Sequence, residues 1–171
     1  MKILFLGAPG SGKSTQGKIL ANDLGFEWIS SGELLRKSED PEIIETLAKG
    51  SLIDDALTER IVTEAMEGKE KVILDGFPRT LAQCEFLVEK GIELDSIVEI
   101  VVPREELLQR IKDRERSPED KIEIAEKRID QYEKTRDTIV GFFEKRGMKI
   151  IQIDGVGEID KIQLKIREAI K

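Results

Sequence analysis

The chain has 171 residues, a formal net charge of −7 and a pI near 4.9, which suits one domain large enough to bury a core. It has no histidine and a single cysteine, Cys84, which excludes imidazole catalysis, an internal disulfide and structural zinc. The acidic total disfavours nucleic-acid binding, and no apolar run has the length of a membrane span. We therefore expect a cytoplasmic protein with neither a nucleic-acid nor a membrane partner.

Five short apolar runs predict strands at residues 3–6, 28–29, 72–74, 97–102 and 150–153. Their Ile, Val and Leu residues do not alternate with polar ones, which is typical of strands buried on both faces of a parallel sheet. Helical segments are predicted at residues 13–23, 54–66, 81–90, 104–112 and 158–170. This alternation predicts an α/β fold, a three-layer, doubly wound parallel sheet of five strands.

The longest predicted helix begins at Ser117 and runs to about Lys145. Residues 117–120 offer a capping hydroxyl, a proline at the first helical position and two acids in the first turn. An apolar stripe at helical spacing then comprises Ile122, Ala125, Ile129, Tyr132, Ile139 and Phe143. Arg128 lies beside this stripe, so we expect it near the core edge of the helix.

Residues 7–14 read GAPGSGKS and lie between the first predicted strand and the first predicted helix. They match the phosphate-binding P-loop pattern in its required context, which indicates a P-loop nucleoside triphosphate hydrolase fold. Glycines let successive N–H groups point inward, and the helix N-terminus adds positive charge. Lys13 is expected to reach the β and γ phosphates, and Ser14 to ligate Mg²⁺.

The apolar run at residues 72–74 ends in Asp75, which is followed by Gly76-Phe77-Pro78-Arg79. This places a carboxylate at the carboxyl edge of a parallel strand, where open α/β sheets bind ligands. We expect Asp75 to serve the Mg²⁺ shell, largely through water, and Arg79 to grip a phosphate with its planar guanidinium.

Phosphoryl transfer needs positive charge around the moving group, and six arginines are candidates to supply it. Position along a helix supports such a role only for Arg128, which is expected near the core edge. For each of the other arginines, an exposed helix face is the expected environment. The six are Arg36, Arg79, Arg110, Arg114, Arg116 and Arg128.

With these residues, the chain resembles the adenylate kinase group of nucleoside monophosphate kinases over nearly its full length. Residues 7–15 resemble the ATP loop of that family, and residues 29–36 (ISSGELLR) the segment that receives AMP. Residues 75–80 (DGFPRT) with Gln83 match its most distinctive signature. Residues 127–132 (KRIDQY) with Thr135 resemble the start of its long helix.

The resemblance implies reversible in-line transfer of the γ-phosphoryl of MgATP to AMP, giving two ADP. It implies that Arg36 and Arg79 hold the AMP phosphate, that Gln83 reads the adenine edge, and that Arg110 lies against the ATP adenine. The implied catalytic residues are Lys13, Arg79, Arg114, Arg116 and Arg128. The implied ATP-binding residues are Gly10, Ser11, Gly12, Lys13, Ser14, Thr15, Arg110, Val156 and Gly157. The implied AMP-binding residues are Ser31, Gly32, Arg36, Ser51, Leu52, Ile53, Gly76, Phe77, Pro78, Arg79, Gln83, Arg116 and Arg128.

The chain departs from the family pattern mainly at the lid over ATP. Only Glu115 separates Arg114 from Arg116, so residues 111–117 are expected to form a vestigial lid loop within a single domain of residues 1–171. The AMP segment, residues 30–57, is also short. Because a lid excludes water, we expect weaker ATP binding or faster opening, and more ATP hydrolysis.

Two alternatives remain open from the residues. One is a kinase for UMP, CMP or another small acceptor, and the other is a non-enzymatic nucleotide-binding switch. Ser31, which keeps a hydroxyl where the family usually has Thr, and Gln83 favour AMP, while the arginine set disfavours a mere binder. We expect ATP and AMP or ADP as ligands, a monomer with a homo-oligomer as the alternative, and Cys84 as a small buried helix residue.

Overall fold

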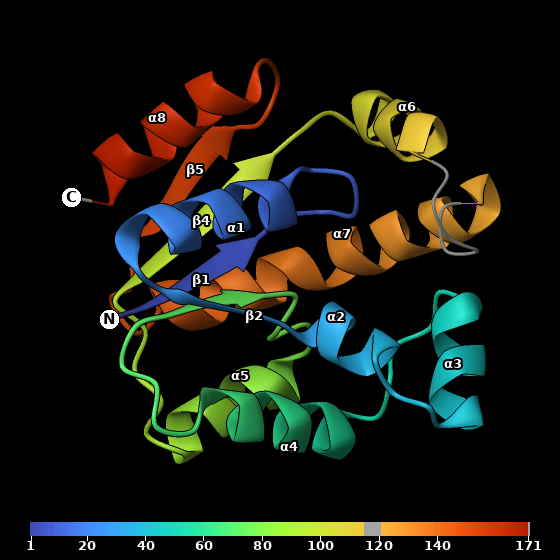
Figure 1. Ribbon diagram of the computed structural model, residues 1–171, viewed down its shortest axis with the longest axis horizontal. Coiled ribbons are helices and arrows are strands. Elements are labelled where there is room, and N and C mark those ends of the chain that lie inside the picture. The colour runs from blue at the N-terminus through green and yellow to red at the C-terminus, as the bar shows by residue number, and fades with distance from the viewer. Residues whose placement is uncertain (115–120, 171) are drawn as a thin grey trace.

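The structure, a computed structural model, describes residues 1–114 and 121–170, without the side chain of Arg114. Five parallel strands form one sheet in the order β2-β3-β1-β4-β5 (Figure 1). The strands are β1 (Lys2–Leu6), β2 (Glu27–Ser30), β3 (Val72–Asp75), β4 (Ser96–Val101) and β5 (Ile150–Asp154). All five strands were predicted from the apolar runs, and the predicted α/β fold class is confirmed.

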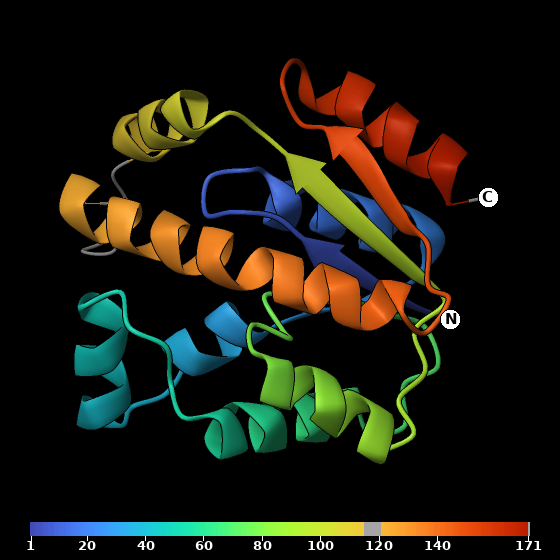
Figure 2. The same ribbon diagram turned by 180° about the vertical axis from the view of Figure 1, so that it is seen from behind.

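The apolar runs of β1 and β3 lack alternation because both faces of the sheet are buried there. In β1, Ile3 and Phe5 belong to one core cluster, whereas Leu4 and Leu6 belong to the other. Helices α1 (Lys13–Leu24) and α8 (Ile159–Ala169) cover the first face. Helices α5 (Leu81–Glu89) and α7 (Ile122–Glu144) cover the second face, with α4 (Asp55–Met66) packed beside α5 (Figures 1 and 2).

Helix α6 (Arg104–Arg114) packs on α7 and against the loop that follows β1. A Cβ atom at Gly10 would lie 3.0 Å from both the Leu107 carbonyl oxygen and the Ile111 Cγ1. Gly10 has a φ of 86°, so this loop requires glycine for its backbone conformation as well as for its close approach to α6. Within residues 1–114 and 121–170, no helix is both long enough and apolar enough to cross a membrane.

Two short helices were not predicted, α2 (Ser31–Arg36) and α3 (Pro41–Ala48). Helix α2 begins directly after β2, where the Ser30 hydroxyl accepts a hydrogen bond from the Glu33 N–H at 3.4 Å. Its six residues are too few to show helical periodicity. Helix α3 carries a local signal that was overlooked, because Asp40 caps it and Pro41 occupies its first turn.

The predicted start of the long helix is wrong. Ser117 lies outside the described residues, but Lys121 has an extended backbone with a ψ of 136°, and α7 begins at Ile122. Ile122 is 45% exposed and does not belong to the apolar stripe. Ala125, Ile129, Ile139 and Phe143 are buried as predicted, whereas the side chain of Tyr132 is only partly buried.

Candidate active site

The loop between β1 and α1 has the shape that its glycines predict. Gly12 is the N-cap of α1 with a φ of 89°, and no described atom lies within 4 Å of the position that its Cβ would occupy. The Ser11 N–H donates to the Ala8 carbonyl at 3.1 Å, which turns the loop back toward the sheet. The start of α1 therefore opens toward the carboxyl edge of the sheet, and Lys13 lines a cavity there.

The carboxyl end of β3 places Asp75 beside this loop. Because β1 and β3 pair in parallel with Phe5 opposite Asp75, the Asp75 side chain emerges where the loop begins. The Ser14 hydroxyl donates to Asp75 Oδ2 at 2.5 Å, and Asp75 is 2% exposed. A hydroxyl and a carboxylate are the hard oxygen ligands that suit Mg²⁺ in its complex with a nucleotide, so this pair fits the predicted ion.

Two arginines converge at the ends of β2 and β3. The Ser31 hydroxyl donates to the Gly76 carbonyl at 2.6 Å, and Arg79 Nε donates to the same oxygen at 2.6 Å. A Cβ atom at Gly32 would lie 3.3 Å from Arg36 Nη1 and 3.6 Å from Arg79 Nη2. Both guanidinium groups therefore lie at the N-terminal turn of α2, and paired guanidinium groups suit a phosphate.

Gln83 on α5 is 3% exposed and lines the same cavity. Its Oε1 accepts a hydrogen bond from the Arg79 N–H at 2.7 Å, and its Nε2 donates to Asp55 Oδ1 at 2.7 Å. Thr80 caps α5 and accepts a hydrogen bond from the Gln83 N–H at 3.2 Å. The amide is thus held at the cavity wall by contacts at both ends.

One cavity brings together most of the residues predicted to bind the acceptor. It lies at the carboxyl edge of β1 and β3, where ligands bind in open α/β sheets. The predicted residues that line it are Lys13, Ser31, Gly32, Arg36, Ser51, Leu52, Ile53, Gly76, Pro78, Arg79, Gln83 and Arg128.

Comparisons with known proteins show the family of the chain. A family model described as adenylate kinase matches residues 5–148 of the chain. The chain belongs to the adenylate kinase family. It is 36% identical to an adenylate kinase from Thermus thermophilus, and the match covers 98% of this chain and 96% of the relative.

Other members of the adenylate kinase family are similar over nearly their whole length. An adenylate kinase from Thermobifida fusca is 33% identical over all of this chain and 98% of the relative. One from Pyrococcus abyssi is 33% identical over 98% of this chain and 94% of the relative, in an alignment of 208 residues. Since that alignment is longer than the chain, the relative has segments that this chain lacks, and the short chain fits a form with a minimal lid.

Family membership confirms the resemblance drawn from the motifs and the predicted enzyme class, a phosphotransferase. It does not favour the alternatives of another acceptor or of a non-enzymatic switch. The adenylate kinase family uses ATP and AMP, with Mg²⁺ accompanying ATP.

Of the residues predicted to bind ATP, Lys13 alone lines the cavity. The others lie in the loop before α1, in the first turn of α1, on α6 and in the turn after β5. Arg110 Nη2 donates to the Gly155 carbonyl at 3.0 Å, so α6 and this turn are in direct contact. Val156 is exposed beside that contact. The side chain of Arg114 and all of Arg116 lie outside the described residues.

Phe77 and Cys84 occupy the hydrophobic core rather than the cavity. The Phe77 ring is 1% exposed, so the structure gives its side chain no place in the cavity lining. Cys84 is fully buried in the same core cluster, as predicted, and burial raises the pKa of its thiol to about 12.

Sequence reasoning missed the wall that α7 contributes to the cavity. Besides Arg128, this wall comprises Gln131, Tyr132, Thr135 and Ile139. These residues follow Arg128 by three, four, seven and eleven positions, so they form one stripe of the helix. The helical spacing from Arg128 was the signal that could have identified them.

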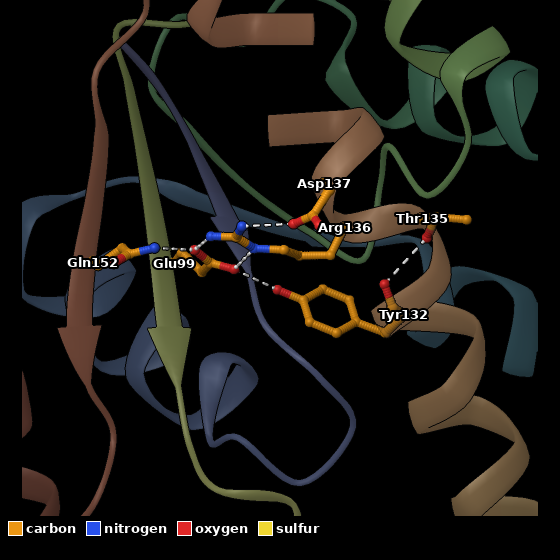
Figure 3. A network of polar contacts seen from close by, with 6 residues as sticks. All are labelled: Glu99, Tyr132, Thr135, Arg136, Asp137 and Gln152. Carbon is orange, nitrogen blue, oxygen red and sulfur yellow. Dashed lines mark hydrogen bonds and ion pairs between the residues drawn. The ribbon is translucent and has the colours of Figure 1, made fainter. Parts of the chain in front are cut away.

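A buried charge network fastens this wall to the sheet (Figure 3). Glu99 on β4 is 2% exposed and accepts hydrogen bonds from Arg136 Nε at 2.7 Å and Nη2 at 2.5 Å. The Tyr132 hydroxyl donates to Glu99 Oε1 at 2.9 Å, and Gln152 Nε2 donates to Oε2 at 3.0 Å. Thr135 lies one turn along α7 from Tyr132, and its hydroxyl donates to backbone carbonyls of the same helix.

The network changes how its members ionise. Burial alone would raise the pKa of Glu99, but the hydrogen bonds from Arg136, Tyr132 and Gln152 outweigh burial and lower it. Burial and the neighbouring carboxylate of Glu99 raise the pKa of Tyr132. Arg136 stays charged, since its hydrogen bonds to Glu99 and Asp137 raise its pKa further. The sequence signal was one acid inside the apolar run of β4, which needs a buried partner.

Proposed function

We propose that the protein transfers the γ-phosphoryl group of ATP to AMP and catalyses the reverse reaction between two ADP molecules. The observation that carries this proposal is the cavity, where Lys13 of the P-loop faces the same space as Arg36, Arg79 and Arg128. These four cations come from four separate elements, α1, α2, the segment after β3, and α7.

We assign two roles to these cations. Arg36 and Arg79 meet at Gly32, and this pairing supports a role in holding the AMP phosphate. Lys13 and Arg128, together with Arg114 and Arg116, then neutralise negative charge on the phosphoryl group during its transfer. A phosphate oxygen of AMP forms the new bond to the γ-phosphorus as the bond to the ADP oxygen breaks, without a covalent enzyme intermediate.

The two bases occupy different parts of the site. Ser51, Leu52 and Ile53 line the same cavity as Gln83, which supports an adenine pocket for AMP there. The contact between Arg110 and Gly155 supports a place for the adenine of ATP between α6 and the turn after β5. The P-loop residues 10–15, at the start of α1, bind the ATP phosphates.

Ser14 and Asp75 are the residues that would hold Mg²⁺ with ATP, Asp75 largely through water. When bound, the ion neutralises charge on the β and γ phosphates. The buried thiol of Cys84 supports a reducing cytoplasm as the location. We propose that a monomer is the working unit.

The test is ADP formation from ATP with AMP, UMP or CMP in a coupled assay, for the wild type and Lys13→Met. We expect AMP to be the best acceptor. The substitution should lower kcat by about 10³-fold, since it removes the positive charge of Lys13 that stabilises the phosphoryl group during transfer. The matched control is Lys18→Met, which removes an exposed charge from the same helix and should leave kcat within about twofold. A preference for UMP, or near-normal turnover of Lys13→Met, would refute the assignment.

A further inference from the structure

Asp55, the first residue of α4, lies behind Gln83 and is not among the residues that line the cavity. It receives two hydrogen bonds, from Gln83 Nε2 on Oδ1 at 2.7 Å and from the Thr80 hydroxyl on Oδ2 at 3.0 Å. Since Thr80 also caps the helix that carries Gln83, the carboxylate is fixed relative to the amide that it contacts.

The two partners of the Gln83 amide dictate its orientation. The Arg79 N–H can only donate, so it requires the oxygen end of the amide. The Asp55 carboxylate can only accept, so it requires the nitrogen end. An amide turned by 180° would set donor against donor and acceptor against acceptor, two mismatches at a buried side chain.

Orientation matters because a primary amide has a second N–H and a second oxygen lone pair for a ligand. The edge of adenine presents a donor at its 6-amino group and an acceptor at N1, whereas a 6-oxopurine presents an acceptor at O6 and a donor at N1. An amide that can turn pairs equally well with either edge. An amide held in one orientation pairs with only one of them.

We propose that Asp55 is a positioning residue that locks the Gln83 amide and so makes the cavity select 6-aminopurine over 6-oxopurine nucleoside monophosphates. This inference rests on the proposed function, in which Gln83 faces the acceptor base. It assigns selectivity to a contact outside the cavity that the ligand does not touch.

The test compares kcat/KM for AMP and for IMP, a 6-oxopurine monophosphate, with ATP as the phosphoryl donor. In Asp55→Asn the new amide can itself turn and so accommodates Gln83 in either orientation, which removes one of the two mismatches. We expect the ratio of kcat/KM for AMP to kcat/KM for IMP to fall about tenfold, which is the effect of leaving one buried hydrogen-bonding group unsatisfied. KM for ATP should be unchanged.

Two further variants complete the design. Asp55→Ala removes the acceptor by truncation and should lower the ratio similarly, so the test does not depend on one variant folding. Glu59→Gln removes a charge one turn further along α4 and should keep the wild-type ratio. If the wild type prefers AMP but both Asp55 variants keep that preference, the lock is refuted while the proposed function stands. A wild type that does not phosphorylate AMP refutes both.

Discussion

A buried side chain can lose the chemistry that its free amino acid has, and Cys84 is the clearest case at the scale of the residue. It lies on α5 in the core cluster that contains Leu87 and Phe143, with no exposed surface. Burial disfavours the thiolate and raises the pKa from its ordinary value of 9.0 to about 12. Because the thiolate is the nucleophile, the folded protein should have an unreactive cysteine.

We predict that Ellman's reagent labels Cys84 in native protein at pH 8 about 10³-fold more slowly than in urea-unfolded protein, because burial keeps the reagent from the thiol and also lowers the thiolate fraction. The urea-unfolded chain is the control, since it exposes the same thiol at the same pH. Rapid, stoichiometric labelling of the native protein would contradict a buried Cys84.

At the scale of the element, α7 forms one wall of the cavity, and the sheet holds it through a charged contact. Arg136 on α7 and Glu99 on β4 form an ion pair in which the Glu99 side chain is almost fully buried and the Arg136 side chain is 27% exposed. Removing one member of a buried pair leaves the other charge without its partner, which costs more than the pair contributes. Together with the buried side chains of Ile129 and Ile139, this contact holds the part of α7 from Arg128 to Ile139 over the sheet.

We predict that Glu99→Gln lowers the free energy of unfolding at pH 7 by about 3 kcal/mol, measured by urea denaturation. The wild type should also lose stability in acid. The pKa of Glu99 is lower in the folded state, so its stabilisation is present above the ordinary value of 4.5 and is lost as the pH falls through the folded-state pKa.

Glu99→Gln should lack this part of the acid dependence. Tyr132→Phe is the matched control, because it removes one hydrogen bond to Glu99 but keeps the ion pair, and should cost about 1 kcal/mol. Identical pH profiles for the wild type and Glu99→Gln between pH 6 and pH 3 would show that the pair does not contribute as described.

At the scale of the whole molecule, α7 also contacts the segment proposed to receive AMP. Lys127 Nζ donates to the Lys49 carbonyl and to the Ser51 hydroxyl, both at 2.9 Å. The loop approaches α7 so closely that a Cβ atom at Gly50 would lie 2.6 Å from Ile124 Cγ2. These contacts hold the loop that lines the cavity against the long helix.

We predict that Lys127→Met raises KM for AMP about threefold, since it releases an exposed contact worth a fraction of a kcal/mol. Steady-state kinetics should show unchanged KM for ATP, because the contact involves only the AMP segment. The control Lys134→Met removes an equivalent charge two turns further along α7. If Lys127→Met raised KM for AMP and KM for ATP equally, the result would indicate general destabilisation instead.

The sequence by itself determined the features that depend on local chemistry. Runs of Ile, Val and Leu specified all five strands, and in β1 and β3 the runs lack polar alternation because both faces are buried. The P-loop and Asp75 were identifiable because backbone turns, helix termini and strand ends follow directly from glycine, capping and hydrophobic patterns. Helix α2 was not predicted, since a six-residue helix is stabilised by tertiary packing and is too short to give a periodic sequence signal.

Only the tertiary structure decided which distant side chains meet. The order β2-β3-β1-β4-β5 sets Ser31 beside Gly76 and brings Arg36, Arg79 and Arg128 to one cavity. It likewise pairs Glu99 with Arg136, 37 positions apart, and Asp55 with Gln83, 28 positions apart. Periodicity along a chain encodes which face of an element is buried, but the partner of a buried polar group depends on which elements pack together.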